Sequence, residues 1–474
     1  MNICAIDIGT SRIKTAVFTE EGKMSFLSGK RLPRAQSPDT QDADVWYDSV
    51  ASLLQSLTEK TKVDAVVLTG NMHALLGVDN KGNAVEKALL WSDQSSQKES
   101  DILNKNYEKI LLRDFGNSSI PVFTLPKLLK MKAERLEVYN KTQKFLQSKD
   151  FILFRLTGNL VTDPSDASGT LLMQYDSNTW SEDLCKELAI DKEKLPQILP
   201  SASVCGYVTE KAAKETGLLS GTPVITGCGD LASAALGSGV NEETFSLTLG
   251  TAGQLLASGR NHSKDLAGKI FVFAHADPAR ELYLGSIPSG GFTFEYLSAL
   301  HNIPIEDFFR KAAEVLLSED LPIFLPYILG KGAPYMDYES NGAWFKLSAA
   351  HNISHICRSA VFGVLASLHQ NSVLLHNLGI QGNTLVLQAL ACREQVVRDT
   401  ANALFPQEKY LPENSEASLL GAAILGFAAM NVYKSIPESA AKLIKKTYLS
   451  PPLPREKETA EHLYKIWCLY RDMI

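Results

Sequence analysis

A chain of 474 residues is too long for one ordinary domain and fits two domains of about 200–250 residues each. Apolar residues make up 45% and charged residues 21%, which is typical of a soluble globular protein. The net charge of −6 and the absence of a long basic run exclude nucleic acid as a favoured partner.

The chain shows no pattern for membranes or secretion. Its longest apolar stretch, Ala417–Met430, has 14 residues and is too short to span a bilayer. The N-terminus enters a predicted strand at once, without the basic and apolar regions of a signal peptide. The seven cysteines form no CxxC pair, so reduced thiols are the simplest interpretation. These features predict a cytoplasmic protein with no membrane partner.

The first half opens with predicted strands at residues 3–8, 13–18 and 24–28. A helix follows in DVWYDSVASLLQSLTEKT, where Val50 and three leucines recur at helical spacing. The next strand, DAVVLTG, ends at Gly70. This β-β-β-α-β order is that of a ribonuclease-H-like layer.

The second half repeats this pattern after a mostly helical insertion at residues 100–215, which includes a hairpin-like piece around 157–175. The predicted strands are 245–250, 253–257, 282–286, 385–388 and 408–411, and the predicted helices are 354–377, 393–404 and 416–430. The glycines of Gly237-Ser238-Gly239 predict a hinge between the halves. We therefore predict an N-terminal domain of residues 1–239 and a C-terminal domain of residues 240–474.

One short motif occurs in each half: IDIGTS at residues 6–11 and LTLGTA at residues 247–252. Each is an alternating strand that runs into Gly-Thr, so Asp7 and Thr248 hold equivalent places. Glycine lets the backbone approach a ligand, and threonine adds a hydroxyl donor. Two such turns facing each other across a cleft would direct N–H groups at a polyphosphate. Only the first half has the carboxylate of Asp7, which suits a metal-assisted site.

Other polar residues follow predicted strands. Asp230 lies in TGCGDLASAALGSG, where an apolar strand meets a small-residue helix. At such a turn an aspartate either faces a cleft or caps the helix, and the spacing alone does not decide. Asp93, in ALLWSDQSS, follows an apolar run, and Asp166, in VTDPSDASGT, lies beside a proline turn. His73, in TGNMHALL, follows a strand end and is either a site residue or a structural one.

These segments together resemble the FGGY carbohydrate kinases over nearly the whole chain. The paired Gly-Thr turns are similar to the phosphate loops of the wider sugar kinase, actin and Hsp70 group. The segments that carry the resemblance are IDIGTS with Lys14, GNMHALL, LLWSDQSS, VTDPSDASGTLLMQYDSNTW, GCGDLASAALGSG, SLTLGTAGQLLA, FLPYILGKGAPYMDYESNGAWFKL and ENSEASLLGAAILG. GNMHALL is similar to the Gly-Gln-Met-His-Gly segment of xylulokinases and sedoheptulokinases. The resemblance predicts an α/β fold of two ribonuclease-H-like domains around a central cleft.

The resemblance also implies a reaction, the ATP-dependent phosphorylation of a sugar hydroxyl with Mg²⁺. It implies that Asp230 is the general base and that Asp7 holds the metal ion. The residues implied to bind ATP are Gly9, Thr10, Ser11, Lys14, Gly250, Thr251 and Ala389. The residues implied to line the sugar pocket are Met72, His73, Asp93 and Asp166.

Two departures from the family pattern affect these expectations. Family members usually have a Gly-rich turn after the strand near 385–388, whereas this chain reads VLQALACRE. The side chains of Gln388 and Leu390 are therefore expected to weaken nucleotide binding. The arginine expected two residues after Asp93 is Ser95, which removes one sugar contact.

We predict a kinase that acts on a terminal hydroxyl of a ketose. The Met-His pair favours xylulose, with sedoheptulose or another sugar of this family as the alternative. An alternative of another class is a catalytically weak sugar-binding regulatory protein, which the altered loop permits. A third is an actin- or Hsp70-like ATPase, which the sugar-domain signature disfavours. The sugar is the expected small-molecule partner, and a homodimer is compatible with the sequence.

Overall fold

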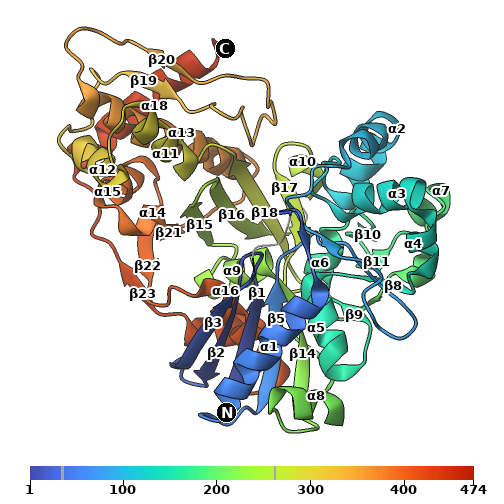
Figure 1. Ribbon diagram of the computed structural model, residues 1–474. Helices are drawn as coiled ribbons and strands as arrows, with labels where there is room; N and C mark the ends of the chain where they lie inside the picture. Colours follow the sequence, from blue (N-terminus) through green and yellow to red (C-terminus); the bar gives the residue numbers. More distant parts are fainter. Residues whose placement is uncertain (34–36, 261–262, 474) are drawn as a thin grey trace. The chain divides into compact units, whose positions relative to one another are not determined.

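The computed structural model describes residues 1–33, 37–260 and 263–473 (Figure 1). It contains a six-stranded sheet of order β13-β14-β5-β1-β2-β3 and a seven-stranded sheet of order β17-β18-β16-β15-β21-β22-β23. The chain forms two compact units. The first comprises Met1–Gly239, Val272–Leu282 and Asn414–Lys445, and the second comprises Val240–Phe271, Tyr283–Glu413 and Lys446–Ile474.

The first sheet confirms the predicted β-β-β-α-β order. Its strands are β1 (Asn2–Ile8), β2 (Arg12–Thr19), β3 (Met24–Arg31), β5 (Ala65–Gly70), β13 (Val204–Tyr207) and β14 (Pro223–Gly229). β1, β2 and β3 pair antiparallel, while β5 runs parallel to both β1 and β14. The helix α1 (Ala43–Thr58) connects this antiparallel meander to β5.

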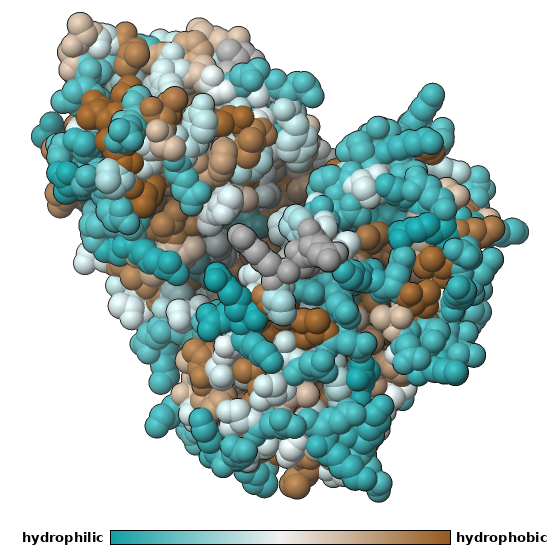
Figure 2. All heavy atoms as spheres, in the orientation of Figure 1, coloured by the Kyte–Doolittle hydropathy of each residue, from teal (hydrophilic) through white to brown (hydrophobic). Residues whose placement is uncertain are grey.

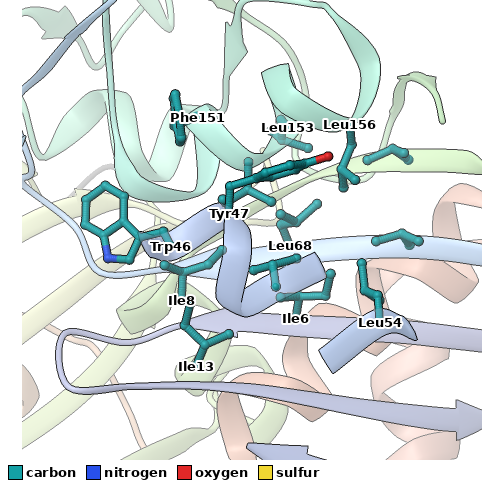
Figure 3. Packing of buried hydrophobic residues seen from close by; sticks show 14 of the residues in the cluster. Ile6, Ile8, Ile13, Trp46, Tyr47, Leu54, Leu68, Phe151, Leu153 and Leu156 are labelled. Carbon is teal, nitrogen blue, oxygen red and sulfur yellow. The ribbon is translucent and has the colours of Figure 1, made fainter. Parts of the chain in front are cut away.

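The alternation along β1 gives the sheet two different faces. Ile6 and Ile8 point toward α1 and α5 (Ser148–Thr157), where they pack with Trp46 and Phe151 (Figure 3). All four side chains are fully buried, and each contributes about 1.5–3 kcal/mol on that account. Asp7 lies between these two isoleucines in sequence and therefore points to the opposite face of the sheet.

Helices α9 (Asp230–Ser238) and α16 (Ala417–Ala429) pack against each other at very short range. A Cβ atom on Gly237 would lie 1.9 Å from the carbonyl oxygen of Ala417, and one on Gly421 would lie 1.9 Å from that of Ser233. The glycines therefore permit the backbones to touch. Gly237, which the sequence placed in a hinge, therefore lies inside α9 and in the contact with α16. For the same reason, residues 414–445 pack in the first unit, although the sequence placed them in the domain 240–474.

The insertion of the first unit is mostly helical, as predicted. Its helices are α2 (Gln97–Phe115), α3 (Thr124–Glu134), α4 (Leu136–Lys141), α5, α6 (Pro164–Ser168) and α7 (Glu182–Glu187), followed by a 3-10 turn at Lys192–Lys194 and by α8 (Glu210–Thr216). The short strands of the first unit, in and before the insertion, pair as β4 (Thr40–Gln41) with β7 (Ala88–Leu89), β6 (Leu76–Val78) with β8 (Lys144–Leu146), β9 (Val161–Thr162) with β12 (Gln197–Ile198) and β10 (Met173–Gln174) with β11 (Thr179–Trp180). Figure 2 shows mostly hydrophilic residues over α2, which matches its many charged side chains.

The predicted hairpin around 157–175 is wrong. β9 pairs with β12 rather than with a strand inside this segment. The chain turns into α6 directly after β9, because Asp163 caps that helix and Pro164 starts it. The cap is complete: the side chain of Asp163 accepts hydrogen bonds from the backbone N–H groups of Ser165 and Asp166.

The second sheet and its helices follow the predicted order of the second half. The strands are β15 (Thr244–Leu249), β16 (Gly253–Gly259), β17 (Phe271–Ala274), β18 (Glu281–Ile287), β21 (Thr384–Ala389), β22 (Glu408–Pro412) and β23 (Lys446–Tyr448), with β19 (Ile323–Leu325) and β20 (Ala343–Phe345) as a separate pair. The helices that complete both units are α10 (Ser263–Leu266), α11 (Gly291–Leu300), α12 (Ile305–Ala313), α13 (Ile353–Asn377), α14 (Leu390–Arg393), α15 (Gln395–Leu404), α17 (Ile436–Leu443) and α18 (Pro454–Arg471). The long helix α13 packs on β16, where Leu368 would crowd any Cβ atom on Gly253.

Candidate active site

Three neighbouring parallel strands of the first sheet end at the same edge. Ile8 at the end of β1 pairs with Gly70 of β5, and Gly70 pairs with Gly229 of β14. Ligands of α/β proteins commonly bind beyond the carboxyl ends of parallel strands. The residues that follow these ends include Gly9, His73 and Asp230, which the sequence singled out separately. The topology therefore brings the candidate phosphate, sugar and base residues to one edge.

Asp7 lies one residue before this edge and faces away from the apolar core. Its Oδ1 is buried and has no hydrogen-bond partner among the described residues. Burial raises the pKa of Asp7 to about 7, and Asp230 and Glu416 add to the rise while Lys14 opposes it. A cation beside this unpartnered, buried carboxylate would favour its ionised form. Mg²⁺ binds through one or two carboxylates plus phosphate oxygens, so the residues fit this ion. Within the described ranges, no cluster of three or more candidate metal ligands occurs.

The first Gly-Thr turn is held by neighbours that the motif does not reveal. A Cβ atom on Gly9 would lie 2.7 Å from the carbonyl oxygen of Arg12, so the tight turn needs glycine. Thr10 Oγ1 accepts a hydrogen bond of 2.9 Å from the indole of Trp91, and Ser11 is exposed. In this turn, the hydroxyl group of Thr10 is hydrogen-bonded to Trp91, and the side chain of Ser11 is exposed to solvent.

Lys14 is paired with a residue from the far end of the chain. Its Nζ lies 2.7 Å from Oε2 of Glu416, the residue directly before α16. In the sequence, Glu416 is only the first residue of the predicted helix 416–430, because a linear pattern does not show so distant a partner. The packing of α16 on the first sheet is what brings this carboxylate beside Lys14 and Asp7.

Asp230 is the first residue of α9, directly after the N-cap Gly229. It is partly buried, and its Oδ1 accepts a hydrogen bond of 2.8 Å from the backbone N–H of Leu231. Burial raises the pKa of Asp230 to about 6, while backbone N–H donors oppose this rise. The N-cap interpretation falls one residue short, because Gly229 occupies that position. A carboxylate with a pKa close to neutrality is suited to accept a proton at physiological pH.

His73 follows β5 in a left-handed conformation, with φ of +66°. Its Nδ1 lies 2.8 Å from the carbonyl oxygen of Gly169, and its ring contacts Phe123 with centroids 5.1 Å apart. Burial lowers the pKa of His73 to about 4, so the ring is neutral at pH 7. Since Nδ1 faces a carbonyl, it carries the proton and leaves Nε2 as an acceptor. Met72 packs beside it, and a Cβ atom on Gly169 would crowd both side chains.

The two other predicted sugar residues are more deeply buried. Asp93 is 5% exposed, and its Oδ1 accepts a hydrogen bond of 2.8 Å from the backbone N–H of Ser95. Ser95 therefore supports the carboxylate of Asp93 through its backbone N–H. Asp166 is fully buried, and its Oδ2 lies 3.0 Å from the ammonium group of Lys149.

Two buried lysines near these residues, Lys127 and Lys149, were not identified from the sequence. Lys127 Nζ donates to the carbonyl oxygens of His73 at 3.0 Å, Leu90 at 2.6 Å and Val122 at 2.8 Å. It therefore joins the His73 segment to the one before Asp93. Burial lowers the pKa of Lys127 to about 7, and Asp93 opposes the shift. Lysine at helical spacing normally indicates a solvated face, so no sequence signal identified either residue.

The second Gly-Thr turn lies between β15 and β16 in the second unit. The carbonyl oxygen of Gly250 accepts a hydrogen bond of 2.7 Å from Gly291, and that of Thr251 accepts one of 3.0 Å from Phe292. Gly291 and Phe292 are the first two residues of α11. The backbone of the turn is therefore anchored to a helix start, while the Thr251 side chain is exposed.

The turn after β21 has glycine geometry without a glycine. Ala389 adopts φ of +54° and ψ of −126°, a conformation that side chains disfavour. Gln388 Nε2 donates to Ser246 Oγ at 2.7 Å, so its side chain lies along β15. Leu390 lies against Gly291, where a Cβ atom would be 3.0 Å from its Cδ1. The backbone shape expected of a Gly-rich turn is kept at the cost of local strain.

Comparison with known proteins identifies the family. Residues 2–237 match the N-terminal domain, and residues 248–430 the C-terminal domain, of the FGGY family of carbohydrate kinases. The xylulose kinase of Staphylococcus xylosus is 30% identical over 81% of this chain and 82% of that protein. The chain belongs to the FGGY family of carbohydrate kinases.

Other FGGY proteins are similar over the full length. The xylulose kinase of Bacillus subtilis is 26% identical over 98% of this chain and 95% of that protein. A crystal structure of ligand-bound xylulose kinase from Lactobacillus acidophilus has a TM-score of 0.91 at 24% identity, and the match covers 100% of this chain and 98% of that one. The ribonuclease-H-like fold predicted from the sequence is thereby confirmed.

Family membership decides between the classes of protein that the sequence left open. This FGGY protein is a sugar kinase, a phosphotransferase, because both halves match carbohydrate kinase domains. The actin- or Hsp70-like ATPase is not supported by these matches. Among the residues that the structure describes, no helix is both long and apolar enough to cross a membrane.

Proposed function

We propose that this FGGY kinase transfers the γ-phosphoryl group of ATP to a terminal hydroxyl of a ketose, with xylulose as the acceptor. The observation that carries the proposal is that Asp7, His73 and Asp230 lie at the adjacent carboxyl ends of β1, β5 and β14, with Asp7 one residue before its strand end. The names of the Bacillus and Staphylococcus relatives support xylulose. Sedoheptulose is the alternative acceptor, and the seven free thiols support a cytoplasmic location.

Asp230 is the general base of the proposed reaction. Phosphoryl transfer needs an oriented nucleophile and charge neutralisation more than covalent help. The carboxylate of Asp230 accepts the proton of the attacking sugar hydroxyl while the hydroxyl oxygen bonds to the γ-phosphorus and the bond from that phosphorus to the bridging oxygen breaks, which releases ADP. Its position at the first residue of α9 places the carboxylate near the positive end of a helix dipole, which favours its ionised form. Its pKa of about 6 leaves it ionised at neutral pH and basic enough to take the proton.

Asp7 would hold Mg²⁺, which supplies charge neutralisation at the phosphates when it is bound. Lys14, Thr10 and Ser11 bind phosphate oxygens in the first unit. In the second unit, which contains Gly250, Thr251 and Ala389, the proposed roles are phosphate binding by the turn of Gly250 and Thr251 and nucleotide binding at Ala389.

The sugar is positioned by the residues that follow β5. His73 Nε2 accepts a hydrogen bond from a sugar hydroxyl, because Nδ1 is committed to Gly169. Met72 provides an apolar surface for the carbon chain. Asp93 offers Oδ2, which has no hydrogen-bond partner among the described residues. Asp166 adds a buried carboxylate close to Met72, since both side chains lie beside Gly229.

A coupled assay of ADP release over ketoses, polyols and aldonates tests the proposed function. We expect ADP release that depends on added sugar and is fastest with xylulose. Release that is equally fast without sugar would contradict the assignment of a sugar acceptor. A higher kcat/KM with sedoheptulose or an aldonate would replace xylulose while keeping the reaction class.

A further inference from the structure

The first unit contains a fully buried group of one lysine and three aspartates, which the roles above leave largely unexplained. Lys149 Nζ lies 2.7 Å from Asp150 Oδ1, 3.0 Å from Asp163 Oδ1 and 3.0 Å from Asp166 Oδ2. All four side chains are 0% exposed. Lys149 donates a hydrogen bond to Asp150, and its charge lies within ion-pair distance of Asp163 and Asp166. The lysine therefore fixes three acidic side chains from two segments of the chain.

Asp163 receives further donors on its second oxygen. Its Oδ2 accepts hydrogen bonds from Ser165 Oγ at 2.6 Å, from Ser165 N at 3.0 Å and from Ser201 Oγ at 2.8 Å. Charge-assisted bonds of this kind are short and strong in a dry interior. Asp163 is thus held from both sides, by the ammonium group and by two hydroxyl groups.

Ser165 extends this group to the strand that carries the proposed base. Its hydroxyl gives its hydrogen to Asp163 and accepts a hydrogen bond of 2.9 Å from the backbone N–H of Gly229. Gly229 is the last residue of β14, and Asp230 follows it directly. One continuous path of contacts therefore runs from the buried ammonium group to the peptide that precedes Asp230.

Side chains also pack against the Cα atom of Gly229. A Cβ atom there would lie 2.7 Å from Met72 Cγ and 2.9 Å from Asp166 Oδ1. Gly229 is therefore confined between the Ser165 hydroxyl on its N–H and the side chains of Met72 and Asp166 on its Cα. The backbone conformation at Gly229 decides where the side chain of Asp230 points.

We propose that Ser165 is a positioning residue for Asp230, and that Lys149 and Asp163 orient the Ser165 hydroxyl so that it holds Gly229 in place. This inference rests on the proposed role of Asp230 as general base. Ser165 does not contact substrate in this account. Its loss misplaces the base, which lowers the rate of the chemical step and leaves sugar binding largely intact.

Ser201 provides a matched control. Like Ser165, it is buried and donates a hydroxyl hydrogen bond to Asp163 Oδ2. Its Oγ makes no contact with Gly229 among the hydrogen bonds of the described residues. Ser165→Ala and Ser201→Ala therefore remove the same kind of bond from Asp163, but only Ser165→Ala releases the Gly229 N–H.

The test compares these variants in the full chain with xylulose, ATP and Mg²⁺. We expect Ser165→Ala to lower kcat roughly 10- to 100-fold while the sugar KM stays within about threefold. Ser201→Ala should keep both values within about threefold of the unmodified protein. Hydrogen exchange of the peptide 226–232 should be faster in Ser165→Ala than in Ser201→Ala, because the Gly229 amide loses its acceptor.

Ser165→Cys is a second variant, for the case in which Ser165→Ala fails to fold. Cysteine has the shape of serine with a slightly larger sulfur atom, but sulfur is a weak acceptor. We therefore expect kcat to fall again and hydrogen exchange at Gly229 to rise. Equal kcat in the Ser165 and Ser201 variants, or unchanged exchange at 226–232, would overturn the positioning role. Asp230→Asn is measured in parallel. If it retains full activity, the proposed base is wrong, and this failure is distinct from a failure of the Ser165 inference.

Discussion

Two opposing influences act on the carboxylate of Asp230. Burial disfavours its charged form, and the backbone N–H groups at the start of α9 favour it. The outcome is a pKa of about 6, higher than that of an ordinary aspartate. A base with this pKa is weakly protonated at pH 7 and still able to accept a proton.

This value predicts the pH dependence of turnover. The reaction needs ionised Asp230, so kcat should rise as the pH increases through about 6 and should be lost as the pH falls below it. The measurement is kcat at saturating sugar and ATP between pH 5 and 9. A profile that stays flat down to pH 5 would contradict a base with a raised pKa.

Lys149 is a second residue whose burial sets its role. It neutralises part of the charge of three buried aspartates, and removal of one partner from a buried ion pair typically costs about 3–5 kcal/mol. Lys149→Met should therefore lower the free energy of unfolding by about that amount. Denaturant unfolding followed by circular dichroism measures it. The exposed Lys141→Met should change stability by less than about 0.5 kcal/mol. A similarly small change in the free energy of unfolding of Lys149→Met would show that Lys149 does not stabilise the buried aspartates.

At the scale of elements, the turn after β21 stores strain in a single residue. Ala389 has φ of +54° and ψ of −126°, a combination that glycine adopts without steric cost. Glycine at this position would remove the strain, and we expect this relief to outweigh the added backbone entropy.

We predict that Ala389→Gly raises the free energy of unfolding by about 1 kcal/mol. Ala391→Gly, two residues further on in the regular turn of α14, should lower it by a similar amount. Thermal unfolding compares the two variants. The ATP KM should also fall in Ala389→Gly at nearly constant kcat, since bare backbone lets the nucleotide approach. Equal destabilisation by both substitutions would refute the strain at Ala389.

Elements with strong periodicity were predicted well from sequence. The meander of β1, β2 and β3 and the long helix α13 fall close to their predicted ranges, because alternating or helical apolar spacing reports directly on burial. The hairpin around 157–175 failed because β9 finds its partner in β12, outside that segment. Strands of two residues leave no periodicity to detect.

The candidate site was only partly visible in the sequence for a related reason. Asp7 lies near the end of a recognisable strand, and His73 and Asp230 each follow one, so their convergence could be expected. The partners that set their electrostatics, such as Glu416 beside Lys14, come from distant segments. Packing alone brings them together, and no spacing rule encodes it.

At the scale of the whole molecule, each compact unit is made of three segments that are separate in the sequence. The first unit holds Asp7, the residues after β5 and Asp230, and it also includes the late segment with Glu416. The second unit holds the other Gly-Thr turn and Ala389. The proposed kinase reaction therefore depends on segments from both ends of the chain, and the base is supplied by the first unit.

The most direct test of this account is the pair of kcat and sugar affinity for Asp230→Asn. Asparagine nearly matches the shape of aspartate but cannot accept a proton. We predict that kcat falls by roughly 10²–10⁴ while the sugar dissociation constant, measured by calorimetry, stays close to that of the unmodified protein. Asp48→Asn, an exposed change on α1, serves as the control and should leave both values unchanged. Near-normal kcat in Asp230→Asn would contradict the account, because Asp230 would then do no more than begin a helix.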